Sequence, residues 1–327
     1  MRLSPDPQPL HISSDDIEAH VGFDLAIEAA DAAARAVAAG AVTTRRTQVS
    51  FEGGWMRVMV ADVSSLGVFG YKEFHLADGR LVRYCVHVFE ETTGRPLGIV
   101  DAARITTLRT AATAAVAIRH LLGERPSVRL GVVGTGSEAL AGVQALSRLV
   151  GLEEIRATSR NPVNREAFAR SVATETGHVV TVSNSLEKVL DGVDLVYAAT
   201  NSGGHVVLRQ EDVAEVGLVA SIGSTLPIQR ELAGAVLAGA DRVVVDTMDV
   251  LEESGDAIEA LDTGWSGDVQ LLGAALSAPA PAGERVVYKS IGSPEQDLVL
   301  AHRIVQHAAE HGYGRRIDAL SAVKENL

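Results

Sequence analysis

The sequence predicts an α/β protein, with a Rossmann doubly wound parallel sheet domain and an α+β domain formed by both chain ends. Three observations support this prediction. Between residues 47 and 100, short runs rich in Val, Tyr and Phe are separated by turn sequences, which is typical of an antiparallel sheet. From residue 128 onward, apolar runs alternate with helical stretches, as in a parallel sheet covered on both faces. A last helical segment, 293–317, is expected to return to the first domain.

The first domain is predicted to open with one long helix. Ser13 to Asp16 have the pattern of a helix cap, the Ala-rich stretch that follows has apolar residues at helical spacing, and Gly40 ends it. The strand-like runs WMRVMVADV, GVFGYKEF and VRYCVHVF come next. Residues 107–122 are apolar on nearly every face, which indicates a helix packed on both sides.

The polar segment ERPS, at 124–127, marks a domain boundary. We therefore expect a substrate-binding and dimerisation domain over residues 1–122 and 293–327, and a nucleotide-binding domain over 123–292. Strands of the second domain are predicted at VRLGVV, EIRAT, HVVTV, DLVYAA, GLVASIG and RVVVD, and APAPAG is expected to be a loop.

Composition excludes several classes of protein. With 327 residues, 46% hydrophobic and 22% charged, the chain can bury two cores and is unlike a disordered protein. A net charge of −13 argues against nucleic acid as a partner, because phosphate binding needs clustered cations. The single cysteine, Cys85, excludes an internal disulfide and is expected to be a small buried hydrophobe. With neither a secretory pattern nor a long apolar run, we expect a cytoplasmic protein without a membrane partner.

A glycine-rich motif follows the run VRLGVV and precedes a helical run. Gly134 permits a tight turn, Gly136 lets the backbone approach a pyrophosphate, and the small Ala139 allows close packing of helix and strand. The phosphate would then lie at the helix N-terminus. The segment predicted to bind a dinucleotide comprises Gly134, Thr135, Gly136, Ser137, Glu138 and Ala139.

The end of the next strand bears on the choice of dinucleotide. An acidic residue there favours NAD, whereas a cation favours the 2′-phosphate of NADP. This chain has Ser159, Arg160 and Asn161 and no carboxylate, so NADP(H) is preferred and NAD(H) stays possible. The alternative is that Arg160 is an ordinary surface residue.

Three cations suggest recognition of an anionic substrate: Arg46 ahead of the sheet, Lys72 in GYKEF and Arg109 at a helix start. Arg109 is expected in the first helical turn, capped by Thr106 or Thr107, where free amides also attract a carboxylate. Each cation alone could equally be a surface or ion-pair residue.

The order of these motifs resembles the ornithine cyclodeaminase/mu-crystallin family from about Ser13 to Gly314. The segments that carry the resemblance are Arg46 before Met59, Gly70-Tyr-Lys72, TTGRPLGIVD, ITTLRTAATAA, GVVGTGSEA, AATNS, ASIGSTLPIQREL, VVVD and YKSIG. The resemblance implies a homodimer in which Arg46, Lys72 and Arg109 surround the substrate carboxylate and the reacting carbon. It also implies cofactor contacts for Ala199, Thr200, Asn201, Ile222 and Gly223. Asp246, Met248, Lys289 and Gly292 are further candidates for cofactor contacts.

One position departs from the cyclodeaminases. Thr225 stands where they carry an Asp that acts as a base, and a hydroxyl cannot take up a proton as a carboxylate can. We therefore expect NADPH-dependent reduction of the C=N bond of a small, cyclic imino acid, or the reverse dehydrogenation, with Lys72, Arg46 and Arg109 as catalytic residues and Thr225 also contacting substrate. The alternatives are a cyclodeaminase with bound NAD and a mu-crystallin-like protein that binds NADPH and a small ligand.

Several further residues are candidates for contacts with a substrate, a metal or neighbouring side chains. The substrate side chain is expected to be read by residues such as Tyr71, Phe74, His75, Tyr84 and His87. No metal is expected, because His307 and His311 lack a third ligand and DTMDVLEESGD lacks the calcium-loop pattern. Glu231 and Asp297 match family positions and could serve as caps, ion-pair partners or site residues.

Overall fold

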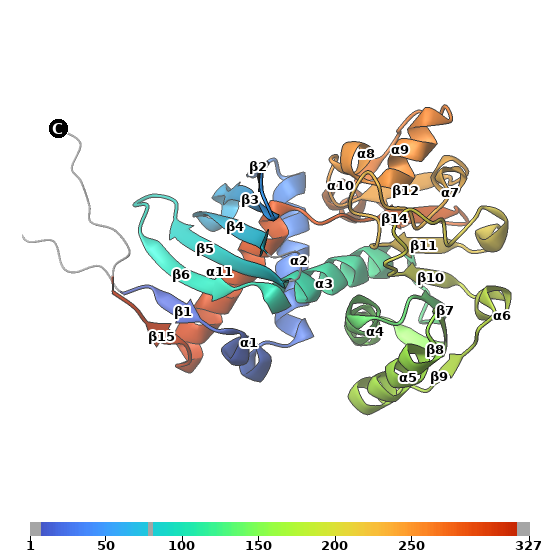
Figure 1. The fold of residues 1–327 in the computed structure, drawn as a ribbon, viewed down its shortest axis with the longest axis horizontal. Coiled ribbons are helices and arrows are strands. Elements are labelled where there is room, and N and C mark those ends of the chain that lie inside the picture. Colours follow the sequence, from blue (N-terminus) through green and yellow to red (C-terminus); the bar gives the residue numbers. More distant parts are fainter. Residues whose placement is uncertain (1–7, 78–80, 319–327) are drawn as a thin grey trace, which may run out of the picture. The chain divides into compact units, whose positions relative to one another are not determined.

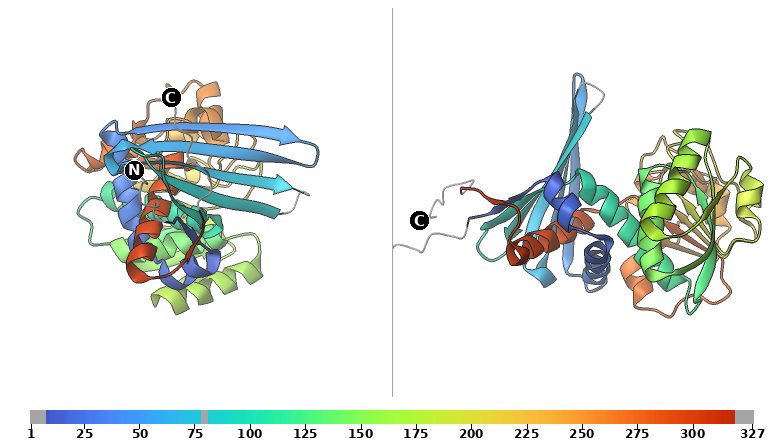
Figure 2. Two further views of the ribbon diagram at one scale, coloured as in Figure 1. Left: turned by 90° about the vertical axis from the view of Figure 1, so that its left-hand side faces the viewer. Right: turned by 90° about the horizontal axis from the view of Figure 1, so that it is seen from below.

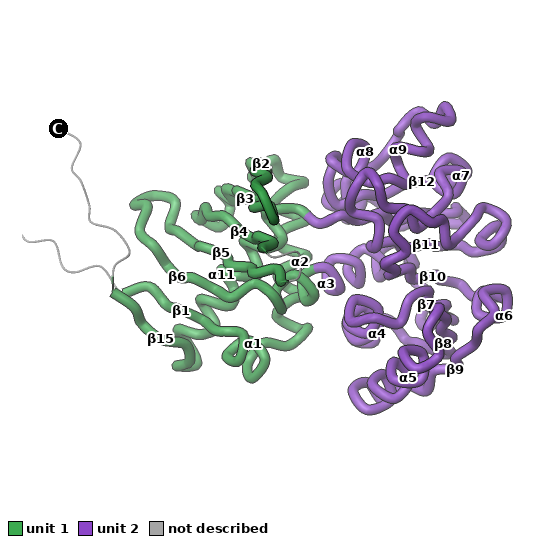
Figure 3. Tube along the Cα trace, in the orientation of Figure 1, with its two compact units in different colours: residues 1–109, 293–327 green, residues 110–292 purple. Residues whose placement is uncertain are grey.

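The computed structural model describes residues 8–77 and 81–318, which form two compact units (Figure 3). Unit 1 comprises residues 1–109 and 293–327, and unit 2 comprises residues 110–292. The first division falls inside helix α3 (Ala103–Leu121), earlier than the expected boundary after residue 122, and the second falls at residue 293. The α/β fold class is confirmed by the two sheets described next.

Unit 1 contains a seven-stranded mixed sheet in the order β15-β1-β6-β5-β4-β3-β2 (Figure 1). Its antiparallel part is a meander, as predicted, because turns such as Phe51–Gly54 join successive strands. The short strand β1 adds in parallel to β6, and β15 pairs with β1. The bounds are β1 Leu10–Ile12, β2 Val42–Phe51, β3 Gly54–Val63, β4 Val68–Ala77, β5 Leu81–Glu90, β6 Pro96–Asp101 and β15 Arg315–Arg316.

The prediction of one long N-terminal helix was wrong. The segment forms α1 (Ser14–His20) and α2 (Phe23–Ala38), because Val21 is extended and buried and Gly22 is a poor helix former. The cap at Ser13 is confirmed, with a reciprocal bond to Asp16. A 3-10 turn, η1, covers Ser64–Leu66. The last helix, α11 (Pro294–His311), ends earlier than predicted, because Gly312 adopts φ +76° and the chain continues into β15.

Helix α11 packs across one face of the sheet in unit 1 (Figure 2). Two glycines allow this approach: a Cβ at Gly70 would collide with Leu298, and one at Gly98 would collide with Val305. Both chain ends therefore contribute to a single core, which confirms the predicted return of the last helix to the first part of the chain.

Unit 2 contains an eight-stranded parallel sheet in the order β13-β12-β14-β11-β10-β7-β8-β9. Read from β9 to β14, this is the Rossmann order, in which β7 is the first strand and a crossover reverses direction beside it. All six predicted strands are confirmed, and β13 and β14 were missed. The bounds are β7 Ser127–Val133, β8 Gly151–Thr158, β9 Val180–Val182, β10 Leu195–Ala198, β11 Leu218–Ser221, β12 Arg242–Val245, β13 Gln270–Leu271 and β14 Val286–Lys289.

Unit 2 holds the C-terminal part of α3 and a further set of helices, of which the first begins within the glycine motif. They are α4 Ser137–Leu149, α5 Pro162–Thr176, α6 Leu186–Leu190, η2 Glu211–Val213, α7 Gly234–Ala238, α8 Val250–Glu253, α9 Gly255–Asp262 and α10 Leu272–Leu276. APAPAG is a loop, as predicted. Among the described residues, no helix is both long enough and apolar enough to cross a membrane.

Candidate functional site

The glycine motif in unit 2 has the geometry that a dinucleotide requires. Gly134 has φ +105°, and a Cβ there would collide with the carbonyl of Ala199. Gly136 is the N-cap of α4; within the described chain no side chain caps this helix and no heavy atom comes within 4 Å of a Cβ added at Gly136. The open helix start offers backbone N–H groups to an anion, so these residues fit a pyrophosphate.

The carboxyl end of β8 lies beside this motif. Thr135 Oγ1 and Ser159 Oγ share a hydrogen bond of 2.6 Å, and exposed Arg160 donates to the carbonyl of Asn201 over 3.2 Å. Arg165, from α5, donates to the carbonyl of Ser159. Sequence reasoning missed Arg165, although a cation one turn into the helix after this strand was the available signal. Asn161 instead caps α5, accepting from Val163 N at 2.9 Å.

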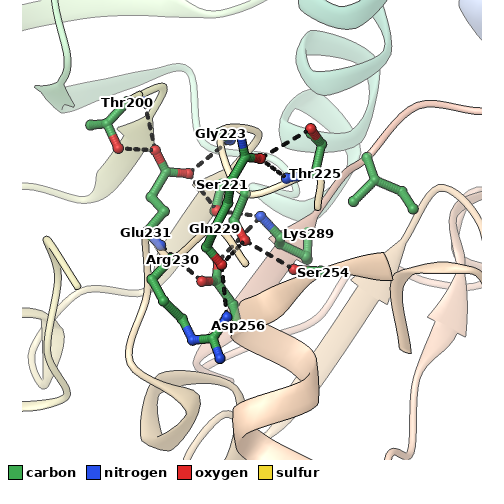
Figure 4. Close-up of polar contacts among 12 residues, drawn as sticks. Thr200, Ser221, Gly223, Thr225, Gln229, Arg230, Glu231, Ser254, Asp256 and Lys289 are labelled. Carbon is green, nitrogen blue, oxygen red and sulfur yellow. Dashed lines mark hydrogen bonds and ion pairs between the residues drawn. The ribbon is translucent and has the colours of Figure 1, made fainter. Parts of the chain in front are cut away.

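The carboxyl ends of β10 and β11 are tied together by Glu231, whose side chain is fully buried (Figure 4). Glu231 Oε1 accepts from Thr200 N at 2.6 Å and from Thr200 Oγ1 at 2.7 Å. Its Oε2 accepts from Ser221 Oγ at 2.6 Å and from Gly223 N at 2.9 Å. One carboxylate therefore fixes both segments that were expected to flank the cofactor.

Lys289 and Asp256 extend this network into the interior of unit 2. Lys289 Nζ donates to Ser221 Oγ at 2.9 Å and lies 3.3 Å from Asp256 Oδ2, and both side chains are 0% exposed. Asp256 Oδ1 accepts from Glu231 N at 2.8 Å. The ammonium of Lys289 is therefore engaged within the protein.

The segment after β12, in which Asp246 and Met248 were expected to contact the cofactor, also holds a neighbouring loop in place. Asp246 accepts hydrogen bonds from Ser290 Oγ at 2.6 Å and from Gly292 N at 2.8 Å. This carboxylate therefore holds the segment that follows β14, in which Gly292 has φ +80°. Met248 is half exposed after β12.

Thr225 is bonded through both its backbone and its side chain to one acceptor. Its N and Oγ1 both donate to Gln229 Oε1, over 2.9 and 3.3 Å (Figure 4). Because the hydroxyl proton points at the amide oxygen, the lone pairs of Oγ1 remain as acceptors, and among the described residues no basic side chain forms a hydrogen bond with this hydroxyl.

In unit 1, Arg46 lies inside strand β2, not ahead of the sheet as expected. It pairs with Met59, which pairs with Lys72 on the next strand. Directly paired residues share a sheet face, so Arg46 and Lys72 project from the same side, roughly 10 Å apart at the backbone. The register therefore places these two cations on one face of the sheet.

Lys72, Arg109 and Asp297 form a buried cluster in unit 1. Lys72 is 3% exposed, and its Nζ donates to Asp297 Oδ1 at 2.8 Å and to Thr106 Oγ1 at 2.8 Å. Arg109 donates from Nε to the same Asp297 oxygen at 3.4 Å and from Nη1 to Gln296 at 3.3 Å. Burial would raise the pKa of Asp297, but the charges of Lys72 and Arg109 and their hydrogen bonds outweigh it and lower the pKa.

The expectation that Arg109 lies in the first helical turn was wrong. Helix α3 begins at Ala103, whose N–H is capped by the Asp101 carboxylate at 3.1 Å. Thr106 is inside the helix, with its hydroxyl bonded to the carbonyl of Ala102, so Arg109 lies in the second turn. Its role depends on Asp297 and Gln296 rather than on free helix-end amides.

Comparisons with known proteins identify the family to which this chain belongs. The Ornithine cyclodeaminase/mu-crystallin family matches residues 9–312. The chain belongs to this family. It is 27% identical over 234 residues to the Delta(1)-pyrroline-2-carboxylate reductase of Bacillus cereus, covering 69% of this chain and 71% of that protein. It is 31% identical over 235 residues to the NAD(P)H-dependent anabolic L-arginine dehydrogenase of Pseudomonas aeruginosa, covering 69% and 72%.

Among solved structures, the chain is similar to a probable ornithine cyclodeaminase from Bordetella pertussis. The two are 29% identical with a TM-score of 0.81, covering 93% of this chain and 99% of the other. The Thermococcus litoralis Delta(1)-pyrroline-2-carboxylate reductase, 23% identical with a TM-score of 0.86 and coverage of 94% and 100%, shares the fold.

In this member of the cyclodeaminase/mu-crystallin family, strand alternation divides the residues expected to read the substrate. Phe74 and Tyr84 share the face of Lys72, whose Nζ lies 5.4 and 5.3 Å from their ring centroids. Tyr71 and His87 stack 4.5 Å apart between the centroids on the opposite face, and His75 points the same way by alternation. These last three therefore do not share the Lys72 face.

The remaining side chains that were weighed for special chemistry make contacts within the protein. His307 and His311 stack with their centroids 3.9 Å apart, and His307 Nδ1 lies 3.0 Å from the hydroxyl of Tyr313. Within residues 8–77 and 81–318, no group of three or more His, Cys, Asp or Glu side chains could hold a metal ion. Cys85 is half-buried, and burial, with Glu73 and Asp101, raises its thiol pKa to about 12.

Proposed function

We propose that this protein uses NADP(H) to reduce the C=N bond of a small imino acid, or to oxidise the corresponding amino acid. The observation that carries the proposal is the buried cluster in which two cations, Lys72 and Arg109, share one carboxylate, that of Asp297. The cluster supplies two positive charges, which suit a substrate carboxylate. The reductase and dehydrogenase activities named for the relatives support the same reaction class.

Each residue of the cluster then has a distinct task. Arg109 orients the carboxylate of the substrate through its guanidinium, and Gln296 and Asp297 hold that guanidinium in place. Lys72, ion-paired with Asp297 in the buried cluster, acts as a fixed positive charge beside the substrate. A reduced nicotinamide supplies the hydride when it is bound.

The bonding of Thr225 bears on the alternatives. Its hydroxyl donates to Gln229, and no base in the described part of the chain accepts its proton, so it cannot remove a proton from a substrate amine. This favours reduction over the deamination with ring closure expected of a cyclodeaminase. Retention of both Lys72 and Arg109 favours catalysis over passive ligand binding by a mu-crystallin-like protein.

A panel of substrates tests the proposed function. Oxidation of NADPH and NADH is followed at 340 nm, a wavelength set by the reduced nicotinamide. The substrates are pyrroline-2-carboxylate, piperideine-2-carboxylate, and 2-oxo acids with ammonia or methylamine. Turnover of at least one imino acid is expected. Clear dinucleotide binding with no turnover anywhere would instead support the ligand-binding alternative, and cyclisation of ornithine would support the cyclodeaminase.

We propose that Ser159, Arg160 and Arg165 together bind the 2′-phosphate and select NADP(H). Replacing both arginines by Ala should weaken NADPH binding by roughly 10- to 100-fold, because each charged contact is worth about 1.5–3 kcal/mol before partial screening. NADH binding should change by less than about threefold, since NADH lacks that phosphate. Fluorescence titration of both dinucleotides measures this, with Arg170→Ala on the same helix as the control. Equal losses for NADPH and NADH would contradict the assignment.

We also propose that the protein is a homodimer assembled through unit 1. Val49 and Val60 expose 65% and 41% of their surface on this unit's sheet, which is unusual for β-branched residues within strands. A structural relative that is 25% identical, an archaeal alanine dehydrogenase, is described as a dimer. Light scattering would measure the mass of this chain, and a monomer at micromolar concentration would contradict the proposal.

A further inference from the structure

The strand order in unit 2 indicates where the nicotinamide half of a bound dinucleotide would lie. The glycine motif follows β7, and the Ser159–Arg160 segment follows β8, on one side of β7. With the adenosine half toward β8, a dinucleotide that spans the sheet extends its other half over β10 and β11. The carboxyl ends of β10 and β11 are therefore the neighbours expected for the nicotinamide ring.

A buried charged network lies at these two strand ends (Figure 4). Glu231, Asp256 and Lys289 are each 0% exposed, and two carboxylates with one ammonium carry a formal charge of −1. Lys289 forms its ion pair with Asp256. Glu231 instead receives four hydrogen bonds from neutral donors on Thr200, Ser221 and Gly223. The excess negative charge is therefore located at the Glu231 carboxylate.

The neighbouring cation Arg230 does not cancel the charge of Glu231. Arg230 approaches the same region, but its Nε lies 3.6 Å from Glu259 Oε2, so that pair is neutral as a whole. The side chains of Arg230 and Glu259 are 24% and 39% exposed, so water screens their charges, whereas the carboxylate of Glu231 is shielded from water. The carboxylate of Glu231 packs directly against the backbone after β11, because a Cβ added at Gly223 would collide with Glu231 Oε1.

We infer that the Glu231–Asp256–Lys289 network stabilises the oxidised nicotinamide relative to the reduced form and thereby assists hydride donation. The inference rests on the proposed function. When a hydride, carrying two electrons, leaves C4 of the dihydronicotinamide for the imine carbon, the neutral ring becomes a cation. The C=N bond becomes a C–N bond, and the protonated imine nitrogen becomes a neutral amine. A preorganised carboxylate at these strand ends would stabilise the positive charge that develops on the ring.

The test compares the dissociation constants of the oxidised and reduced forms of the same dinucleotide. For Glu231→Gln, the ratio of the oxidised to the reduced dissociation constant should rise roughly tenfold, as expected when a full charge is removed from a site that is shielded from water. Calorimetry measures the oxidised form and fluorescence the reduced form. A purely structural role would weaken both forms alike and leave the ratio unchanged.

Two further variants keep the test decisive. Asp256→Asn removes one charge from the network and retains the four hydrogen bonds to the Glu231 carboxylate, so its ratio should rise in the same direction. Glu259→Gln removes a partly exposed carboxylate nearby and should change the ratio by less than about twofold, because water screens it. The inference is overturned if every network variant that still binds dinucleotide keeps the wild-type ratio of dissociation constants. It is also overturned if Glu259→Gln shifts this ratio as much as the network variants do. Failure of the wild-type protein to bind either form would refute the proposed function instead.

Discussion

Asp297→Asn is expected to destabilise unit 1 by about 3–5 kcal/mol, because it leaves Lys72 and Arg109 buried without their shared counter-charge. Asp297 is 0% exposed and accepts from both cations through one oxygen. Denaturant unfolding would measure the loss through Trp55, which lies in unit 1, in a Trp265→Phe background at constant protein concentration.

Asp31→Asn provides the matched control. Asp31 pairs with Arg35 one turn away in α2, and both side chains are substantially exposed. Removal of this pair should change the unfolding free energy by less than about 0.5 kcal/mol, because exposed helical pairs contribute little. If Asp297→Asn unfolds no more readily than Asp31→Asn, the buried cluster is not what stabilises this part of unit 1.

The difference between wild type and Asp297→Asn should also depend on pH. Since the pKa of Asp297 is lowered in the folded state from its ordinary value of 3.8, its stabilising contribution is fully present above that value. The contribution is lost as the pH falls through the folded pKa. The difference should therefore be constant near neutral pH and should shrink below about pH 4. A difference that grows on acidification would contradict the ion pairing.

Arg109→Ala is expected to lower kcat/KM for the imino acid by roughly 100-fold or more, as the loss of a buried charged contact predicts. The effect should appear mainly in KM, because the guanidinium binds the carboxylate in both the ground state and the transition state. The affinity for NADPH should stay within about twofold. Steady-state kinetics and dinucleotide titration measure the two quantities separately.

Arg104→Ala is the control for this change. Arg104 lies on the same helix, α3, but is exposed, so its removal should leave kcat/KM within about twofold. Unchanged saturation kinetics in Arg109→Ala would show that the substrate carboxylate binds elsewhere, and the proposed function would then lose the observation that carries it.

Local patterns were sufficient to predict the parts of the fold in which each residue's environment is set by near neighbours. The period-2 runs of residues 47–100 gave the meander correctly, and the glycine motif gave the turn between β7 and α4. The prediction of one long N-terminal helix was wrong because a single residue, Gly22, ends the helical pattern and divides α1 from α2. Strand β14 was missed because its pairing partners, β11 and β12, are distant in the chain.

The sequence by itself determined the family, the dinucleotide motif and the cations Arg46, Lys72 and Arg109, because these depend on residue type and spacing along the chain. Only the tertiary structure decided their partners. Asp297 reaches Lys72 across 225 positions of sequence, and no local pattern encodes such a contact. The same holds for Glu231, Asp256 and Lys289, whose shared burial follows from the order in which the strands of unit 2 pair. Burial makes these charges chemically important, since water would otherwise screen them.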